Sequence, residues 1–139
     1  MPGLIIGGTL TEAPEDFTSL NETVQGPMLM KQSGFPPFVH YLSWVGTPEG
    51  VITATRPDGG LWAQRVRDRG GNGLLRIGEE TYAMEAFEIL DENRMSMMQQ
   101  WADKSGRPLD EPLYPGSEPL NEWEVFFWRP RDITEAGGQ

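Results

Sequence analysis

Glycine and proline interrupt this chain so often that they limit the length of any regular element. There are 17 glycines and 12 prolines among 139 residues. Proline blocks helix interiors, and glycine–proline steps favour turns. Such steps recur through residues 1–37, and five prolines punctuate residues 107–139. We therefore expect an extended N-terminal arm over 1–37, a folded core over 38–106 and a proline-rich C-terminal arm over 107–139.

The first half of the core has the composition of β structure. Residues 38–45 are rich in aromatic and β-branched side chains, and residues 51–55 form a second short run before a Pro-Asp-Gly-Gly turn. Residues 61–67 alternate between two faces, and residues 74–77 follow a glycine-rich loop. The pattern predicts an antiparallel meander of three or four strands.

The second half of the core is predicted to be helical. Apolar side chains between residues 79 and 104 recur at spacings of three, four and seven, namely Ala83, Phe87, Leu90, Met97 and Trp101. Lys104, Gly106 and Pro108 then provide a typical helix stop. The polar stretch 91–94 could split this helix in two. The predicted fold class is α+β, a small antiparallel β-meander with one helix, flanked by extended N- and C-terminal arms.

Charge argues against nucleic acid as a partner. The formal net charge is −10 at pH 7, and affinity for phosphate backbones depends on Lys and Arg. Residues 56–76 nevertheless hold five arginines against two aspartates. Such a basic island suits packing between subunits, and we expect Arg65 and Arg67 to face a neighbouring subunit. Arginines solvated on a strand face are the alternative.

Few residues of the chain are suited to catalysis. His40 is the only histidine, its surroundings favour a packed core position, and there is no cysteine. Transition-metal sites and nucleophile–histidine pairs are thus unfavourable, so we expect no metal, no cofactor and no enzymatic activity. A hydrolase that uses paired carboxylates such as Glu79 with Glu80, or Asp110 with Glu111, remains a rival. No apolar run approaches the ~20 residues that cross a membrane, and no membrane association is expected.

The most aromatic run lies in the predicted C-terminal arm, at residues 123–128. It could be a strand that completes the chain's own core, or an anchor on another subunit. As partner-binding residues we select Trp123, Phe126, Phe127 and Trp128.

One segment resembles a module of bacteriophage structural proteins. Residues 46–54, Gly-Thr-Pro-Glu-Gly-Val-Ile-Thr-Ala, are followed by Gly-Gly-Leu-Trp at 59–62 and by Leu-Leu-Arg at 74–76. This is similar to a pattern in tail fibres, head fibres and collar parts, and it covers about 30 residues. The family's proline after Ala54 is displaced to Pro57, and its polar C-terminal half is absent.

The resemblance implies a non-enzymatic virion structural protein, either a head decoration protein, a head fibre or a tail or collar component. It would be assembled in the host cytoplasm, located in the virion, and bind other virion proteins through its arms. Extended arms gain order on neighbours, so we also expect a homo-oligomer, with a trimer as the guess. The alternative is a receptor- or carbohydrate-binding module of a phage fibre, in which Trp44, Trp62 and Trp101 would stack on sugar rings.

Overall fold

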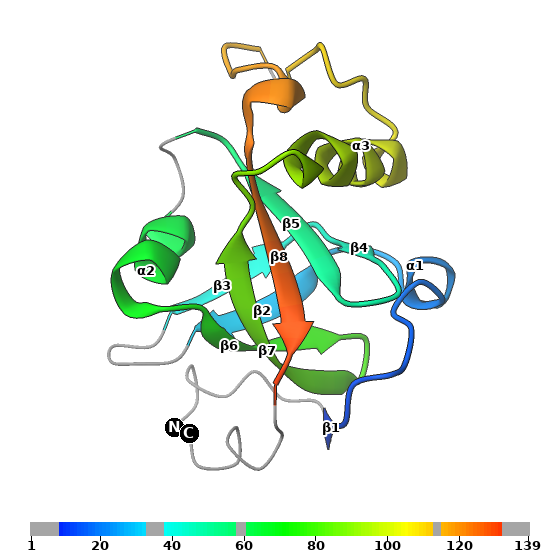
Figure 1. Cartoon of the computed structure of the whole chain (residues 1–139). Coiled ribbons are helices and arrows are strands. Elements are labelled where there is room, and N and C mark those ends of the chain that lie inside the picture. Colours follow the sequence, from blue (N-terminus) through cyan, green and yellow to red (C-terminus); the bar gives the residue numbers. More distant parts are fainter. Residues whose placement is uncertain (1–8, 33–37, 58–60, 113–114, 132–139) are drawn as a thin grey trace.

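The computed structural model describes residues 9–32, 38–57, 61–112 and 115–131 (Figure 1). Its elements along the chain are β1 (Thr9–Thr11), α1 (Leu20–Thr23), β2 (Met28–Gln32), β3 (Phe38–Leu42), β4 (Val45–Gly46), β5 (Val51–Thr55), α2 (Leu61–Arg69), β6 (Asn72–Ile77), β7 (Glu80–Glu88), α3 (Asn93–Ser105), the 3-10 turn η2 (Leu120–Glu122) and β8 (Glu124–Pro130). The predicted α+β class is confirmed.

The strands form one curved sheet in the order β3-β2-β6-β7-β8-β5-β4. Every pairing along this path is antiparallel, and β1 adds a short parallel pairing to β7. The sheet bends into a half-barrel, with α2 at one end and α3 across one face (Figure 1). The architecture is therefore larger than the predicted meander.

Both segments expected to be arms contribute strands to this sheet. β2 lies between β3 and β6, and β8 lies between β7 and β5. The extended-arm part of the fold prediction is wrong, because the apolar side chains of these segments are buried in the chain itself. Whether the chain also divides into domains at residues 37 and 106 stays a prediction.

Two elements were predicted with the wrong secondary structure. The strand expected at 61–67 is helix α2, in which Trp62 and Ala63 are buried on the side that packs against the sheet. The helix expected over 79–104 is strand β7 followed by α3. β7 is paired along both edges, so its ladder of hydrogen bonds outweighs the helix propensity of its Ala, Met and Glu residues.

Other expectations agree with the structure. The strand at 51–55 is β5, the run at 74–77 lies within β6, and the run at 38–45 divides into β3 and β4. Gly106 ends α3 in the left-handed conformation, with φ of 71°, as the stop signal predicted.

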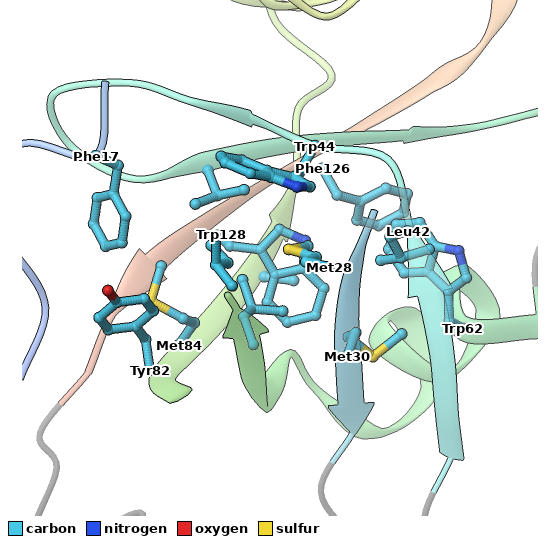
Figure 2. Packing of buried hydrophobic residues seen from close by; sticks show 14 of the residues in the cluster. Phe17, Met28, Met30, Leu42, Trp44, Trp62, Tyr82, Met84, Phe126 and Trp128 are labelled. Atoms are coloured by element: carbon cyan, nitrogen blue, oxygen red, sulfur yellow. The ribbon is translucent and has the colours of Figure 1, made fainter. Parts of the chain in front are cut away.

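Two hydrophobic cores lie on opposite faces of the sheet. The first, shown in Figure 2, fills the inside of the half-barrel, and the second lies beneath α3. β8 serves both, because side chains alternate along a strand. Phe126 and Trp128 enter the first core, whereas Val125 and Phe127 enter the second.

In the part of the chain that the structure describes, no helix has the length and apolar character needed to span a bilayer.

Candidate functional site

The candidate site is built around helix α2, which closes one end of the half-barrel. Trp62, in the first turn of α2, is 3% exposed. Its ring centroid lies 4.7 Å from that of Phe126 and 6.2 Å from that of Trp128. The three rings belong to the cluster in Figure 2, and they form a rigid apolar base beneath the helix.

Gln32 joins the end of β2 to this first turn of α2. Its side chain is buried, with the residue 3% exposed, and Nε2 donates a hydrogen bond of 2.8 Å to the carbonyl oxygen of Trp62. The other amide atom, Oε1, is buried and has no hydrogen-bond partner among the described residues. A buried acceptor in this state loses its hydration without compensation. This oxygen is thus shielded from solvent beneath α2, and its burial costs stability.

Arginines cluster on α2 four residues apart. Arg65 is half-buried and Arg69 is exposed. The pKa of Arg65 is lowered, first by burial and second by the positive charge of Arg69. Residues four apart on a helix share a face, so these two guanidinium groups concentrate positive charge on one side of α2. On a chain of net charge −10, this is a local attraction for an anion.

Arg67 lies on the same helix, and its side chain contacts β7 and β8. Its Nε and Nη2 donate to the two carboxylate oxygens of Glu88 at 2.8 and 2.7 Å, and Nη2 also pairs with Glu124 at 2.9 Å. These contacts raise the pKa of Arg67, mainly through the hydrogen bond with Glu88. Arg67 thus ties α2 to β7 and β8. The contact of Arg65 and Arg67 with another subunit stays a prediction.

The four aromatic residues predicted to bind a partner lie inside the protein. Phe126 and Trp128 are fully buried in the first core, and Trp123 and Phe127 are buried in the second. The structure thus places this run in the chain's own core, the first of the two alternatives. Binding of a partner through these side chains stays a prediction, and it would require β8 to leave the sheet.

The remaining candidate residues do not assemble into a site. Trp44, Trp62 and Trp101 are 3–4% exposed, so none of the three presents a ring face to a sugar. His40 is exposed on β3 rather than packed in a core. Among the described residues, no group of three or more His, Asp or Glu side chains could hold a metal ion.

An open groove lies on another part of the sheet. Its volume is about 330 Å³, and its lining includes Leu29, Tyr41 and Arg76. The Arg76 side chain is already engaged, since Nε donates to the Gly78 carbonyl oxygen and Nη2 pairs weakly with Glu79. Among its described lining residues this groove offers one cation, Arg76, whereas α2 carries Arg65 and Arg69 on one face.

Comparison with solved structures identifies the fold. A protein of Listeria innocua named as a pyridoxamine 5'-phosphate oxidase superposes with a TM-score of 0.58, covering 82% of this chain and 90% of that one at 13% identity. A protein named F420 reductase superposes with a TM-score of 0.51, covering 86% and 97% at 13% identity. No family model and no curated protein match the sequence.

These comparisons overturn the phage assignment. Both neighbours are named as oxidoreductases, not virion proteins, so the predicted virion function, location, capsid or tail partners and receptor-binding alternative are wrong. The trimer was expected from that assembly and loses its support. The resemblance rested on residues 46–54, 59–62 and 74–76, which include the end of β4, most of β5, the start of α2 and part of β6. Turn residues such as those between these elements occur in many β folds.

The expectation of a non-enzymatic chain is overturned by the same finding. It rested on the lack of cysteine and the single histidine, which argue against nucleophilic and metal catalysis. They do not bear on reactions in which a bound organic cofactor supplies the reactive atoms. Gln32 was also missed, because no sequence pattern distinguishes a strand-terminal glutamine beneath a helix from a solvated one.

Proposed function

We propose that this chain binds a phosphate-bearing redox cofactor of the flavin or deazaflavin type beside α2 and acts as an oxidoreductase. The proposal is supported by the fold, which is shared with proteins named as an oxidase and an F420 reductase. The observation that carries it is local: α2 carries Arg65 and Arg69 on one face, four residues apart, close enough for the charge of Arg69 to lower the pKa of Arg65.

The arginines of α2 suit the phosphate end of such a cofactor. Guanidinium groups bind phosphate oxygens through charge-assisted, often bidentate hydrogen bonds. Arg65 and Arg69 supply that charge, and the exposed Arg56 follows β5 close to the start of α2 in sequence.

The protein's part in the reaction would be to bind and orient the cofactor. When bound, a flavin or deazaflavin supplies hydride transfer, so the chain needs no nucleophile of its own. Arg65 and Arg69 would hold the phosphate. Trp62, Phe126 and Trp128 keep the base of α2 free of water, since all three are buried.

Cofactor binding by the purified chain tests the proposal. FMN and F420 should each be titrated by calorimetry, with riboflavin as the ligand that lacks the phosphate. We expect at least one of the two to bind, and riboflavin to bind more weakly than FMN if FMN is the ligand. The double variant R65Q/R69Q should lower the affinity about tenfold or more, because each lost charge-assisted hydrogen bond weakens phosphate binding.

Arg107→Gln is the matched control. Arg107 is exposed just after α3, away from α2 in the chain, and its loss changes the net charge by one without touching the site. Its affinity should stay close to that of the unchanged protein. Failure of both FMN and F420 to bind, or binding that R65Q/R69Q leaves unaltered, would contradict the proposal.

A further inference from the structure

We propose that the open groove on the outer face of the sheet, the face of β2, β3 and β6 that turns away from the first core, binds a small aromatic carboxylate. The groove measures about 330 Å³, within the range of roughly 300–1,000 Å³ that small-molecule sites occupy. It is a second site, separate from the one at α2, and does not depend on the proposed cofactor. It combines an exposed aromatic ring, apolar side chains and one cation.

The strand register places three lining side chains in a row across the sheet. Leu29 of β2 pairs with Tyr41 of β3 on one side and with Arg76 of β6 on the other. Paired residues of neighbouring strands point to the same face. Met28 and Met30 enter the first core, so by alternation Leu29 and its two partners lie on the outer face. The groove is therefore built on this row.

The sheet separates the groove from the base of α2. The contact with α2 is at the other end of β2, where Gln32 is buried and donates to the carbonyl oxygen of Trp62. Leu29 lies three residues earlier, roughly 10 Å along the strand, and it faces the opposite side. Neither Arg65 nor Arg69 is among the described lining residues of the groove.

The apolar part of the lining suits a flat ring. The side chain of Tyr41 is 65% exposed, so most of its surface is open to a ligand. Leu29 beside it is half-buried, and Val24 and Pro27 continue the apolar lining. An aromatic ring in the groove would cover Leu29 and pack against the ring of Tyr41. An aliphatic ligand of the same size would lose the second contact.

Arg76 provides the charge for the carboxylate. Its Nε donates to the carbonyl oxygen of Gly78 at 3.1 Å, which holds the guanidinium in position. Its Nη2 reaches Glu79 only at 3.5 Å, and the Glu79 side chain is 90% exposed. Exposed pairs of this kind contribute little, so a ligand carboxylate can replace Glu79 at the guanidinium. A single cation suits a monocarboxylate, whereas the two arginines of α2 suit a phosphate.

The first test varies the ligand. Binding of naphthalene-2-carboxylate to the full chain is followed by NMR, through the Nε–H signal of Arg76 and the methyl signals of Leu29. The neutral analogue is 2-naphthamide. We expect the carboxylate to shift both sets of signals and to bind about tenfold more tightly than the amide, because the amide cannot form the charge-assisted contact. Equal affinities of the two ligands would overturn the proposal.

The second test varies the protein. Arg76→Gln should weaken binding of naphthalene-2-carboxylate about tenfold, and Tyr41→Leu about threefold. Glu79→Gln should strengthen binding about two- to fivefold, because it removes the competing carboxylate. Glu118→Gln, an exposed carboxylate outside the described groove lining, is the matched control and should leave the affinity unchanged.

The Glu79→Gln result keeps the test decisive if Arg76→Gln is poorly folded, since misfolding does not produce a gain in affinity. A Glu79→Gln protein that binds no better than Glu118→Gln would refute the role of Arg76.

Two further measurements separate this proposal from its rivals. In R65Q/R69Q the affinity for naphthalene-2-carboxylate should be unchanged. A loss there, with none in Arg76→Gln, would place the anion at α2 and overturn the proposal. Analytical ultracentrifugation of the unchanged protein and of Tyr41→Leu gives the oligomeric state. A dimer that Tyr41→Leu dissociates would show that a second copy occupies the groove, which also overturns it.

Discussion

Arg67 and Glu88 form a two-point contact between α2 and β7, with both carboxylate oxygens bound at 2.7–2.8 Å. Their side chains are only 27% and 17% exposed. Glu124 of β8 adds a second carboxylate to the same guanidinium, and the Phe126 ring lies 5.7 Å below it. One side chain thus fixes the helix that carries the candidate site to the two central strands.

Replacing Arg67 by methionine should destabilise the protein. Two half-buried carboxylates would lose their shared cation and face each other. We expect a loss of about 2 kcal/mol in the free energy of unfolding, measured by urea denaturation. Arg69→Met, an exposed change on the same helix, should stay within about 0.5 kcal/mol. Equal effects of the two variants would show that the contact is not what holds α2.

Gly71 is required by the approach of β7. A methyl group at this position would overlap the backbone carbonyl of Ala86, whose N–H donates to the Gly71 carbonyl oxygen at 2.8 Å. Gly71→Ala should therefore cost about 2 kcal/mol or more by equilibrium unfolding. Asn72→Ala, at the exposed next position, provides the comparison. A Gly71→Ala protein as stable as the Asn72→Ala protein would contradict this packing.

The indole N–H of Trp128 is bonded to Thr53. The indole Nε1 donates to Thr53 Oγ1 at 2.9 Å, and both residues are fully buried. Thr53→Val keeps the side-chain shape but leaves a buried donor without an acceptor. Its free energy of unfolding should fall by about 1–3 kcal/mol, whereas Thr23→Val on the exposed surface of α1 should have little effect. A neutral Thr53→Val change would show that the indole finds another partner.

Lys104 should titrate at an unusually low pH. Its ammonium donates to the Trp44 carbonyl oxygen at 2.8 Å and lies 3.3 Å from the centroid of the Trp44 ring. Burial lowers the pKa of Lys104 to about 8. Because the unfolded chain holds this proton up to about pH 10.4, the contribution of Lys104 to stability should rise between pH 8 and 10.

The Lys104 prediction can be checked in two ways. A titration followed through the carbon-13 shift of Cε gives the pKa directly. Lys104→Met should remove the corresponding rise in stability with pH, while Lys31→Met leaves it in place. A midpoint near 10.4 for Lys104 would show that the ammonium stays fully hydrated.

The sequence was informative where local signals decide the structure. β5 is bounded by turns at both ends, and the left-handed Gly106 stops α3, so both could be predicted. It was misleading where pairing with distant strands decides. β7 consists largely of Thr, Ala, Met and Glu, and nothing local shows that β6, β8 and β1 flank it. In α2, the spacing of Trp62 and Val66 fits a helix, but the alternation at 61–67 suggested a strand instead.

The candidate site could be predicted only in part. The basic island at 56–76 was visible, and α2 concentrates part of it on one helix. The role of Arg67 could not be predicted, because its partners Glu88 and Glu124 lie 21 and 57 residues away in the sequence. Gln32 donates its side-chain hydrogen bond to the carbonyl oxygen of Trp62, 30 residues later. These contacts between distant residues form only when the strands of the sheet have paired.

The central position of β8 also has a consequence for synthesis. β5 and β7 are made first, and both are left with an open edge until residues 124–130 emerge from the ribosome. Until then neither hydrophobic core has its strand of aromatic side chains, and two unpaired strands are exposed to other chains. A nascent chain stalled before residue 124 should therefore be sensitive to proteases and prone to aggregation. The sheet is therefore expected to form only after residues 124–130 have left the ribosome.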